Sequence, residues 1–253
     1  MWKFYDKIID EIPDDLDAVI DFVHVGEVWT IVGAGEYVGM AVTVNEQDFD
    51  LFEFSGIANH DFLGMPLKDA ACYCESWNFL EASIGTAALN AYLNSYHHLT
   101  DPKLFRGMSQ KPNASNGFND YKSLAAGKKV AVVGHFTKLE EYLTDSELYV
   151  LERKPQPGDF PDSACEYILP ECDYAFITGS AFINKTLPRL LDIANNPIVL
   201  GPSTPMSREL FERGAIELNG FCPGPEIRHH AIEVATGIKF KQYGTALTLK
   251  SKP

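Results

Sequence analysis

Polar and glycine residues follow four short apolar segments in the second half of the chain. The first segment ends at Gly134-His135-Phe136, the second at Glu152, and the third at Thr178-Gly179-Ser180 with Asn184 close behind. The fourth ends at Gly201-Pro202-Ser203-Thr204. The carboxyl ends of parallel strands in an open sheet face one crevice, which is where such sheets bind ligands. The pattern therefore predicts a ligand site built from four strand ends.

Two of these residues have side chains suited to catalysis. His135 directly follows the first segment, and an imidazole there can transfer protons near neutral pH. The alternative is a histidine that only donates a hydrogen bond to a nearby backbone carbonyl. Glu152 follows Gly134 by about 20 residues, the position at which an acid in nucleotide-binding sheets accepts hydrogen bonds from a ribose. Its alternative is a solvated strand end.

The loop after the first segment contains one glycine, Gly134, so the pyrophosphate-binding part of a dinucleotide fingerprint is missing. This favours a nucleoside, a pterin-like ring or an adenosyl group over a dinucleotide. Ser203 and Thr204 precede Pro205 and a predicted helix at Met206, and their hydroxyls can cap that helix. The alternative is a helix N-terminus that binds an anion, and Thr178 to Ser180 permits the same two interpretations.

The cysteines leave a metal-binding alternative open. Cys72-x-Cys74 could bind a soft metal through thiolates. However, residues two apart on a helix point in different directions, and no second Cys or His pair lies nearby at metal-ligand spacing. We therefore assign no metal ligand. The five cysteines, an odd number at irregular spacing, indicate reduced thiols rather than a disulfide framework.

Composition excludes several classes of function. The chain has 253 residues and a formal net charge of −14, which disfavours a nucleic-acid partner because such binding depends on basic residues. It contains no run of 18 apolar residues and no apolar segment typical of a signal peptide near Met1. We therefore expect a cytoplasmic protein with a small-molecule ligand, no nucleic-acid partner and no membrane partner. A homo-oligomer stays open, and the sequence identifies no cofactor.

The apolar segments that carry the site alternate with helical patterns. This alternation predicts an α/β fold in which a doubly wound, mostly parallel, Rossmann-like sheet is covered by helices on both faces. The expected strands are residues 130–133, 148–151, 174–177, 198–200 and 215–218, and the expected helices are 139–143, 163–169, 187–194 and 208–213.

The first half of the chain has a different pattern. Residues 1–24 have helical spacing, with Pro13 separating two short helices. Residues 25–32 and 38–44 read as a hairpin. Gly33, Gly35 and Gly39 follow its first strand and resemble a dinucleotide fingerprint, but a β-branched segment comes after them where the fingerprint requires a helix. Helices are expected at 67–75 and 78–96, so this half is α+β. Turn-rich residues 100–122 separate domain 1–110 from domain 121–253.

These motifs together resemble the putative heavy-metal-chelation family, whose members have uncharacterised functions. The resemblance rests on motifs spread over nearly the whole chain: Val132-Val-Gly-His-Phe136, Glu152, Leu169-Pro170, Ile177-Thr-Gly-Ser-Ala-Phe-Ile-Asn184, Gly201-Pro-Ser-Thr-Pro205, Leu210-Phe211, Gly214 and Ile84-Gly-Thr-Ala-Ala-Leu-Asn90. It implies an enolase-N-terminal-like domain followed by a Rossmann-like domain, with partial likeness to Rossmann methyltransferases. It also implies a site between the domains, which Asn90 would enter from the first.

Two functions remain to be distinguished. The first is an enzyme that acts on a chelator, pterin, flavin or cobalamin-type compound by condensation or hydrolysis, as the resemblance implies. His135 and Glu152 would be its catalytic residues. The alternative is a metal-binding or metal-carrying protein without catalysis. A scaffold protein is a third option, and the absence of a pocket would favour it.

Overall fold

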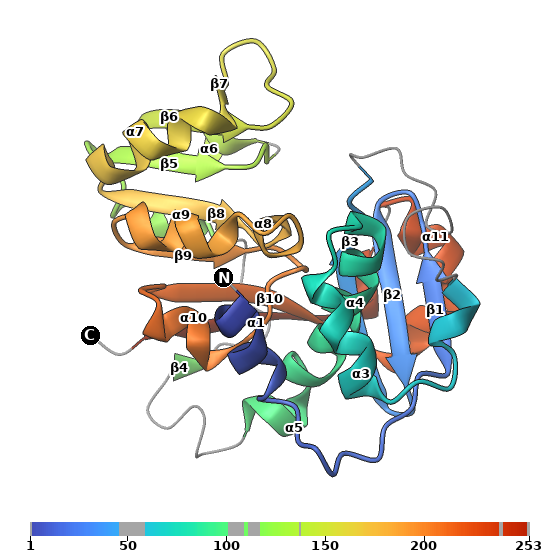
Figure 1. The fold of residues 1–253 in the computed structure, drawn as a ribbon. Coiled ribbons are helices and arrows are strands. Elements are labelled where there is room, and N and C mark those ends of the chain that lie inside the picture. Colours follow the sequence, from blue (N-terminus) through green and yellow to red (C-terminus); the bar gives the residue numbers. More distant parts are fainter. Residues whose placement is uncertain are drawn as a thin grey trace.

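Two sheets organise the chain in the computed structural model, which describes residues 2–45, 59–100, 109–110, 117–136, 138–237 and 240–251. A small antiparallel sheet has the order β1-β2-β3, and a mostly parallel sheet of eight strands stands beside it (Figure 1). The fold is therefore mixed α/β. In the described part of the chain, no helix is long and apolar enough to cross a membrane.

The small sheet contains the predicted hairpin. Its strands are β1 (Phe22–Val25), β2 (Trp29–Ala34) and β3 (Tyr37–Val42). Gly35 has φ 61° in the turn between β2 and β3, which suits a glycine. Because β3 is a strand, the interpretation of the glycines as a hairpin rather than a dinucleotide fingerprint is confirmed.

Helices cover both faces of this sheet. On one face, Val32 and Ala41 share a core with α4 (Phe79–Leu93). On the other face, Ile31 and Met40 pack with the C-terminal segment that contains α11 (Ala231–Ala235). Successive side chains of a strand point to opposite faces of the sheet, so the hairpin contributes residues to two cores.

The large sheet has the order β4-β11-β10-β9-β8-β5-β6-β7. The six strands from β10 to β7 pair in parallel, whereas β11 is antiparallel to β10 and to β4. The chain runs outward from β5 to β6 and β7 on one side, then returns to β8 on the other side. The order therefore reverses between β5 and β8. The strands are β4 (Ser109–Gln110), β5 (Lys129–Val133), β6 (Glu147–Glu152), β7 (Phe160–Pro161), β8 (Tyr174–Thr178), β9 (Pro197–Leu200), β10 (Glu217–Pro223) and β11 (Gly244–Lys250).

Alternate residues of the central strands face two separate cores. Ala131 and Ile177 belong to the larger core, which includes helices α7, α9 and α10, whereas Val132 and Phe176 belong to a second core with η3 and α6. Both faces of the sheet are thus covered. The helices are η3 (Asn119–Tyr121), α6 (Leu139–Tyr142), η4 (Asp162–Ala164), α7 (Cys165–Ile168), η5 (Leu169–Glu171), α8 (Ser180–Ile183), α9 (Leu187–Ile193) and α10 (Arg208–Glu212).

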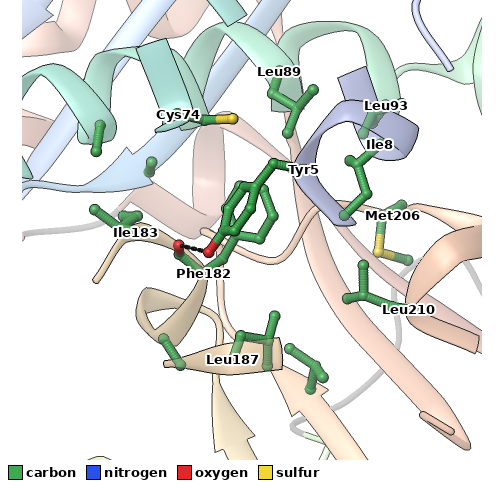
Figure 2. Packing of buried hydrophobic residues seen from close by; sticks show 14 of the residues in the cluster. Tyr5, Ile8, Cys74, Leu89, Leu93, Phe182, Ile183, Leu187, Met206 and Leu210 are labelled. Atoms are coloured by element: carbon green, nitrogen blue, oxygen red, sulfur yellow. Dashed lines mark hydrogen bonds between the residues drawn. The ribbon is translucent and has the colours of Figure 1, made fainter. Parts of the chain in front are cut away.

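The two ends of the chain each pack on the other half. Helix α1 (Trp2–Ile9) lies against α10, and Tyr5 donates a hydrogen bond of 2.8 Å to the backbone oxygen of Phe182 (Figure 2). At the other end, η6 (Pro225–His230) and α11 reach the small sheet. One core cluster therefore includes residues of both halves. The predicted domain boundary stays a prediction, and residues 101–108 and 111–116 of it lie outside the described residues.

Some predicted helices differ from those observed. After α1 the expected second helix is wrong: Ile20 donates to the backbone oxygen of Met65, and Leu67 donates to Ala18. The apolar residues there are buried by this extended pairing, which local spacing cannot reveal. The expected helix 67–75 is α3 (Leu67–Ala71) followed by η2 (Cys72–Glu75). The expected helix 78–96 ends at Leu93, and α5 (Tyr96–Leu99) begins after a new cap.

Candidate functional site

A cavity of about 240 Å³ lies at the carboxyl ends of β5, β6 and β8, where the strand order reverses. Ligands of open α/β sheets bind at such a switch point. Seven residues predicted from the sequence line it: Gly134, His135, Phe136, Glu152, Thr178, Ser180 and Asn184. The other lining residues are Val133, Leu151, Arg153, Asp162, Cys165, Ala181, Thr186 and Leu190.

The carboxylate of Glu152 is held by backbone groups. Its Oε2 accepts a hydrogen bond of 2.8 Å from the amide of His135, and its Oε1 accepts one of 2.7 Å from the amide of Arg153. Each oxygen of an ionised carboxylate has a second lone pair. Glu152 is thus a fixed acceptor in the cavity lining, and it also ties the loop after β5 to the end of β6.

The imidazole of His135 is held by the side chain of Asp159. Its Nδ1 lies 3.2 Å from Oδ2 of Asp159, whose side chain is 7% exposed. Gly134 precedes it with φ 100°, and a Cβ atom there would lie 3.0 Å from the side chain of Thr178. Both the backbone angle and the close approach favour glycine at this position. The ring of Phe136 completes this part of the lining.

Hydroxyl and amide groups line the cavity beyond β8. The hydroxyls of Thr178 and Ser180 are 3.0 Å apart and share one hydrogen bond. Oδ1 of Asn184 accepts from the amide and the hydroxyl of Thr186, at 3.2 Å and 2.7 Å. The oxygen of Asn184 is therefore engaged locally, which orients its side-chain amide. These groups can donate and accept hydrogen bonds without carrying charge.

Arg153 supplies the only Lys or Arg side chain in the described lining. Its guanidinium carbon lies 6.0 Å from the ring centre of Phe79, and its Nε lies 3.7 Å from Asp162. Phe79 begins helix α4, so this arginine of the cavity lining contacts an element of the first half.

The fourth predicted strand end lies outside the cavity lining. Ser203 accepts a hydrogen bond of 2.8 Å from the amide of Val42 in β3. Asn90 of α4 donates to the backbone oxygens of Met40 and Pro202, at 3.1 Å and 3.3 Å. The structure therefore places Asn90 and residues 202–204 at the joint between the two sheets, while the amide of Gly201 donates to Asn219 of β10.

Close packing at this joint involves the third strand end as well. A Cβ atom on Gly179 would lie 2.7 Å from the amide nitrogen of Thr204, which is itself fully buried. The helix cap predicted for Ser203 and Thr204 is wrong, because Ser207 caps α10 by accepting from the amide of Glu209. Both hydroxyls face the joint instead of the helix.

Replacing Ser203 with alanine is expected to destabilise the protein by about 1–2 kcal/mol, because the partly buried amide of Val42 loses its acceptor. The matched control is Ser163→Ala, at an exposed serine, which should change the stability by less than about 0.5 kcal/mol. Urea denaturation measures both. Equal stability of the two variants would show that the bond at the joint contributes nothing.

The two cysteines of the Cys72-x-Cys74 pair lie in different environments. Cys72 is exposed and its thiol contacts the backbone oxygen of Lys68 at 3.4 Å, whereas Cys74 is fully buried. Burial raises the pKa of the Cys74 thiol well above its usual range, which opposes the thiolate form that metals bind. Across the described ranges, no group of three or more His, Cys, Asp or Glu side chains could hold a metal ion.

Sequence reasoning missed Asp159, Arg153, Asp162 and Thr186. Asp159 carried a usable signal, since it directly follows Pro157-Gly158, a dipeptide typical of a tight turn. Arg153 directly follows Glu152, and a basic residue at a strand end is common on a solvated surface. Asp162 and Thr186 begin or precede helices, and nothing local separates them from ordinary caps.

Similarity to known proteins agrees with this architecture. Two family models, both described as "Putative heavy-metal chelation", match residues 118–248 and 5–93. A crystal structure of a protein of unknown function from Desulfitobacterium hafniense, in the family of the first model, is 36% identical with a TM-score of 0.86 over 99% of both chains. Another of that family, from Pyrococcus horikoshii, is 20% identical with a TM-score of 0.75 over 98% of both chains, a likeness of fold. An uncharacterised protein of Methanocaldococcus jannaschii is 28% identical over 186 residues, 69% of this chain and 65% of that relative.

Proposed function

Because this chain belongs to the putative heavy-metal-chelation family, we propose that it acts on a small chelator-type organic molecule bound in the cavity at the ends of β5, β6 and β8. The observation that carries the proposal is the cavity itself, which combines a fixed carboxylate, an imidazole and a row of hydroxyl and amide groups at the switch point of the sheet.

The domain names from the sequence belong to this proposal. We assign a Rossmann-like character to the large sheet, and the support is its strand order: counted among the parallel strands, it is the 3-2-1-4-5-6 order typical of that fold. The small sheet with α3 and α4 is assigned an enolase-N-terminal-like character on resemblance. The reaction class proposed for the site is condensation or hydrolysis, with His135 transferring a proton and Glu152 binding the ligand.

The size and lining of the cavity restrict the ligand. A volume of about 240 Å³ is below the range of about 300–1,000 Å³ typical of drug-sized ligands. It suits one ring system with its sugar or side chain rather than a whole dinucleotide. Glu152 can accept hydrogen bonds from hydroxyl groups, and Phe136 offers an aromatic face. A nucleoside, a pterin or a flavin with a hydroxylated side chain meets both requirements.

Direct metal binding by the chain is the less favoured function. The described residues offer no cluster of three suitable side chains, and the buried thiol of Cys74 is held in its neutral form. The family description is compatible with an enzyme that makes or cleaves an organic chelator. Residues 46–58 lie outside the described part, and no site is proposed there.

Isothermal titration calorimetry with adenosine, neopterin and riboflavin tests the proposal. At least one of these probes is expected to bind. The variant Glu152→Gln should weaken that binding by about tenfold, because a carboxylate that accepts ligand hydroxyls is lost. The matched control is Glu147→Gln at the other end of β6, where the side chain is exposed and contacts the hydroxyl of Tyr149. Absence of binding by all three probes, or equal binding by both variants, would contradict the proposed function.

A further inference from the structure

We infer that Asp159 positions His135 as a proton acceptor, by holding the imidazole in the tautomer that carries hydrogen on Nδ1 and a lone pair on Nε2. The pair was not apparent from the sequence, in which His135 stood alone. The part of the inference that concerns proton transfer to a ligand rests on the proposed function. The part that concerns the tautomer rests on geometry alone.

A tight turn fixes the Asp159 carboxylate. The amide of Asp159 donates a hydrogen bond of 2.9 Å to the backbone oxygen of Gln156, and Gly158 between them has φ 103°. In return, Oδ2 of Asp159 accepts a bond of 2.9 Å from the amide of Gln156. The next residues, Phe160–Pro161, form β7 and pair with β6. Because β7 begins at the residue after Asp159, pairing with β6 fixes the position of the Asp159 carboxylate.

His135 is held at two points. Its backbone amide donates to Glu152, and its Nδ1 lies 3.2 Å from Oδ2 of Asp159. An ionised carboxylate can only accept hydrogen bonds, so the nitrogen beside it must be the one that carries hydrogen. Which nitrogen of a histidine is protonated is set by the bond that the other nitrogen makes. The lone pair then lies on Nε2.

The imidazole is placed to use that lone pair. His135 lines the cavity and its side chain is 37% exposed, whereas Asp159 is not a lining residue and its side chain is 7% exposed. A ligand in the cavity therefore meets the histidine and not the aspartate. His135 is the catalytic residue of the pair, and Asp159 is a positioning residue.

The step that this arrangement supports is a simple proton transfer. An O–H or N–H bond of the ligand breaks, its electron pair stays on the ligand atom, and the proton forms a new N–H bond at Nε2. The ring then carries a positive charge, which lies next to the Asp159 carboxylate and is stabilised by it. Return of the proton from Nε2 to an atom of the ligand restores the neutral ring.

Long-range ¹H–¹⁵N NMR of histidine-labelled protein tests the tautomer without any ligand. His135 is assigned by comparison with His135→Gln. In the neutral ring we expect Nδ1–H to exceed Nε2–H by at least about tenfold, because a charge-assisted hydrogen bond holds it. Asp159→Ala should shift the ring toward Nε2–H. Asp162→Ala, which removes a carboxylate of the cavity lining, should leave the Nδ1–H tautomer in place.

Two outcomes would overturn the inference: an Nε2–H tautomer in the unmodified protein, or an Nδ1–H tautomer that persists in Asp159→Ala. Thermal unfolding of each variant confirms that it is folded before its spectrum is interpreted. These results are independent of calorimetry. Failure of every probe to bind refutes the proposed function but does not affect the conclusion about the tautomer. An Nε2–H tautomer refutes the role of Asp159 even if a probe binds.

Discussion

Replacing Gly39 with alanine is expected to lower the free energy of unfolding by more than about 4 kcal/mol, or to prevent folding altogether. Gly39 lies in the middle of β3, where α4 crosses the sheet. A Cβ atom there would lie 2.0 Å from the backbone oxygen of Ala87 and 2.3 Å from the backbone nitrogen of Ala91. Both atoms belong to the helix backbone, so no side-chain rotation relieves the clash. The helix has to move away from the sheet, and the core between them opens.

Circular dichroism and urea denaturation measure this effect. The matched control is Gly35→Asn in the turn of the same hairpin. Gly35 has φ 61°, a left-handed conformation that asparagine tolerates, and no atom lies within 4 Å of a Cβ built there. The control should unfold within about 1 kcal/mol of the unmodified protein. If Gly39→Ala unfolds at the same urea concentration as Gly35→Asn, the close approach of α4 to β3 is not as described.

The hairpin shows what local sequence can and cannot reveal. A β-branched segment after Gly39 was sufficient to predict a strand and to reject a dinucleotide fingerprint. The reason for the glycine itself depends on Ala87 and Ala91, which follow about 50 residues later in the chain and contact it only after folding. No local pattern carries that information.

The candidate site was predictable to the extent that strand ends determine it. The ends of β5, β6 and β8 were expected to meet, and one cavity collects residues from all three. The end of β9 was expected to join them, but β3 and α4 occupy its hydroxyl and carbonyl groups at the joint. The sequence indicates which residues follow a strand. It does not indicate which of them another part of the protein will bind.

The least predictable segments are those that pack on the opposite half. The apolar residues near Ile20 have helical spacing, yet they are buried by pairing with the segment around Met65. The C-terminal residues after β10 were left unassigned, and they form η6 and α11 on the small sheet and β11 on the large one. In each case burial comes from a distant partner, which overrides the local preference.

Replacing Lys185 with methionine is expected to stabilise the protein by about 1–3 kcal/mol at pH 7, because a buried ammonium group costs desolvation free energy. Lys185 is 6% exposed, and its Nζ donates 2.6 Å to the backbone oxygen of Ile183. The same Nζ lies 5.7 Å and 5.9 Å from the ring centres of Tyr5 and Phe79. These contacts offset only part of the cost. Desolvation lowers the pKa of Lys185 from 10.5 to about 8, and the nearby carboxylate of Glu75 opposes that shift.

The pH dependence of the stabilisation by Lys185→Met identifies its cause. A folded-state pKa of about 8 lies below the unfolded value, so the unfolded chain binds the proton more tightly and stability rises with pH between the two values. The desolvation penalty of the charged Lys185 side chain is complete below about pH 8, and it is lost by about pH 10.5. The advantage of Lys185→Met should therefore shrink by about 1–2 kcal/mol between about pH 7 and about pH 9.5 in urea denaturation. Lys122→Met, at an exposed lysine, should show no such change. An advantage that is equal at both pH values would mean that the methionine stabilises by packing alone, and that Lys185 carries no buried charge.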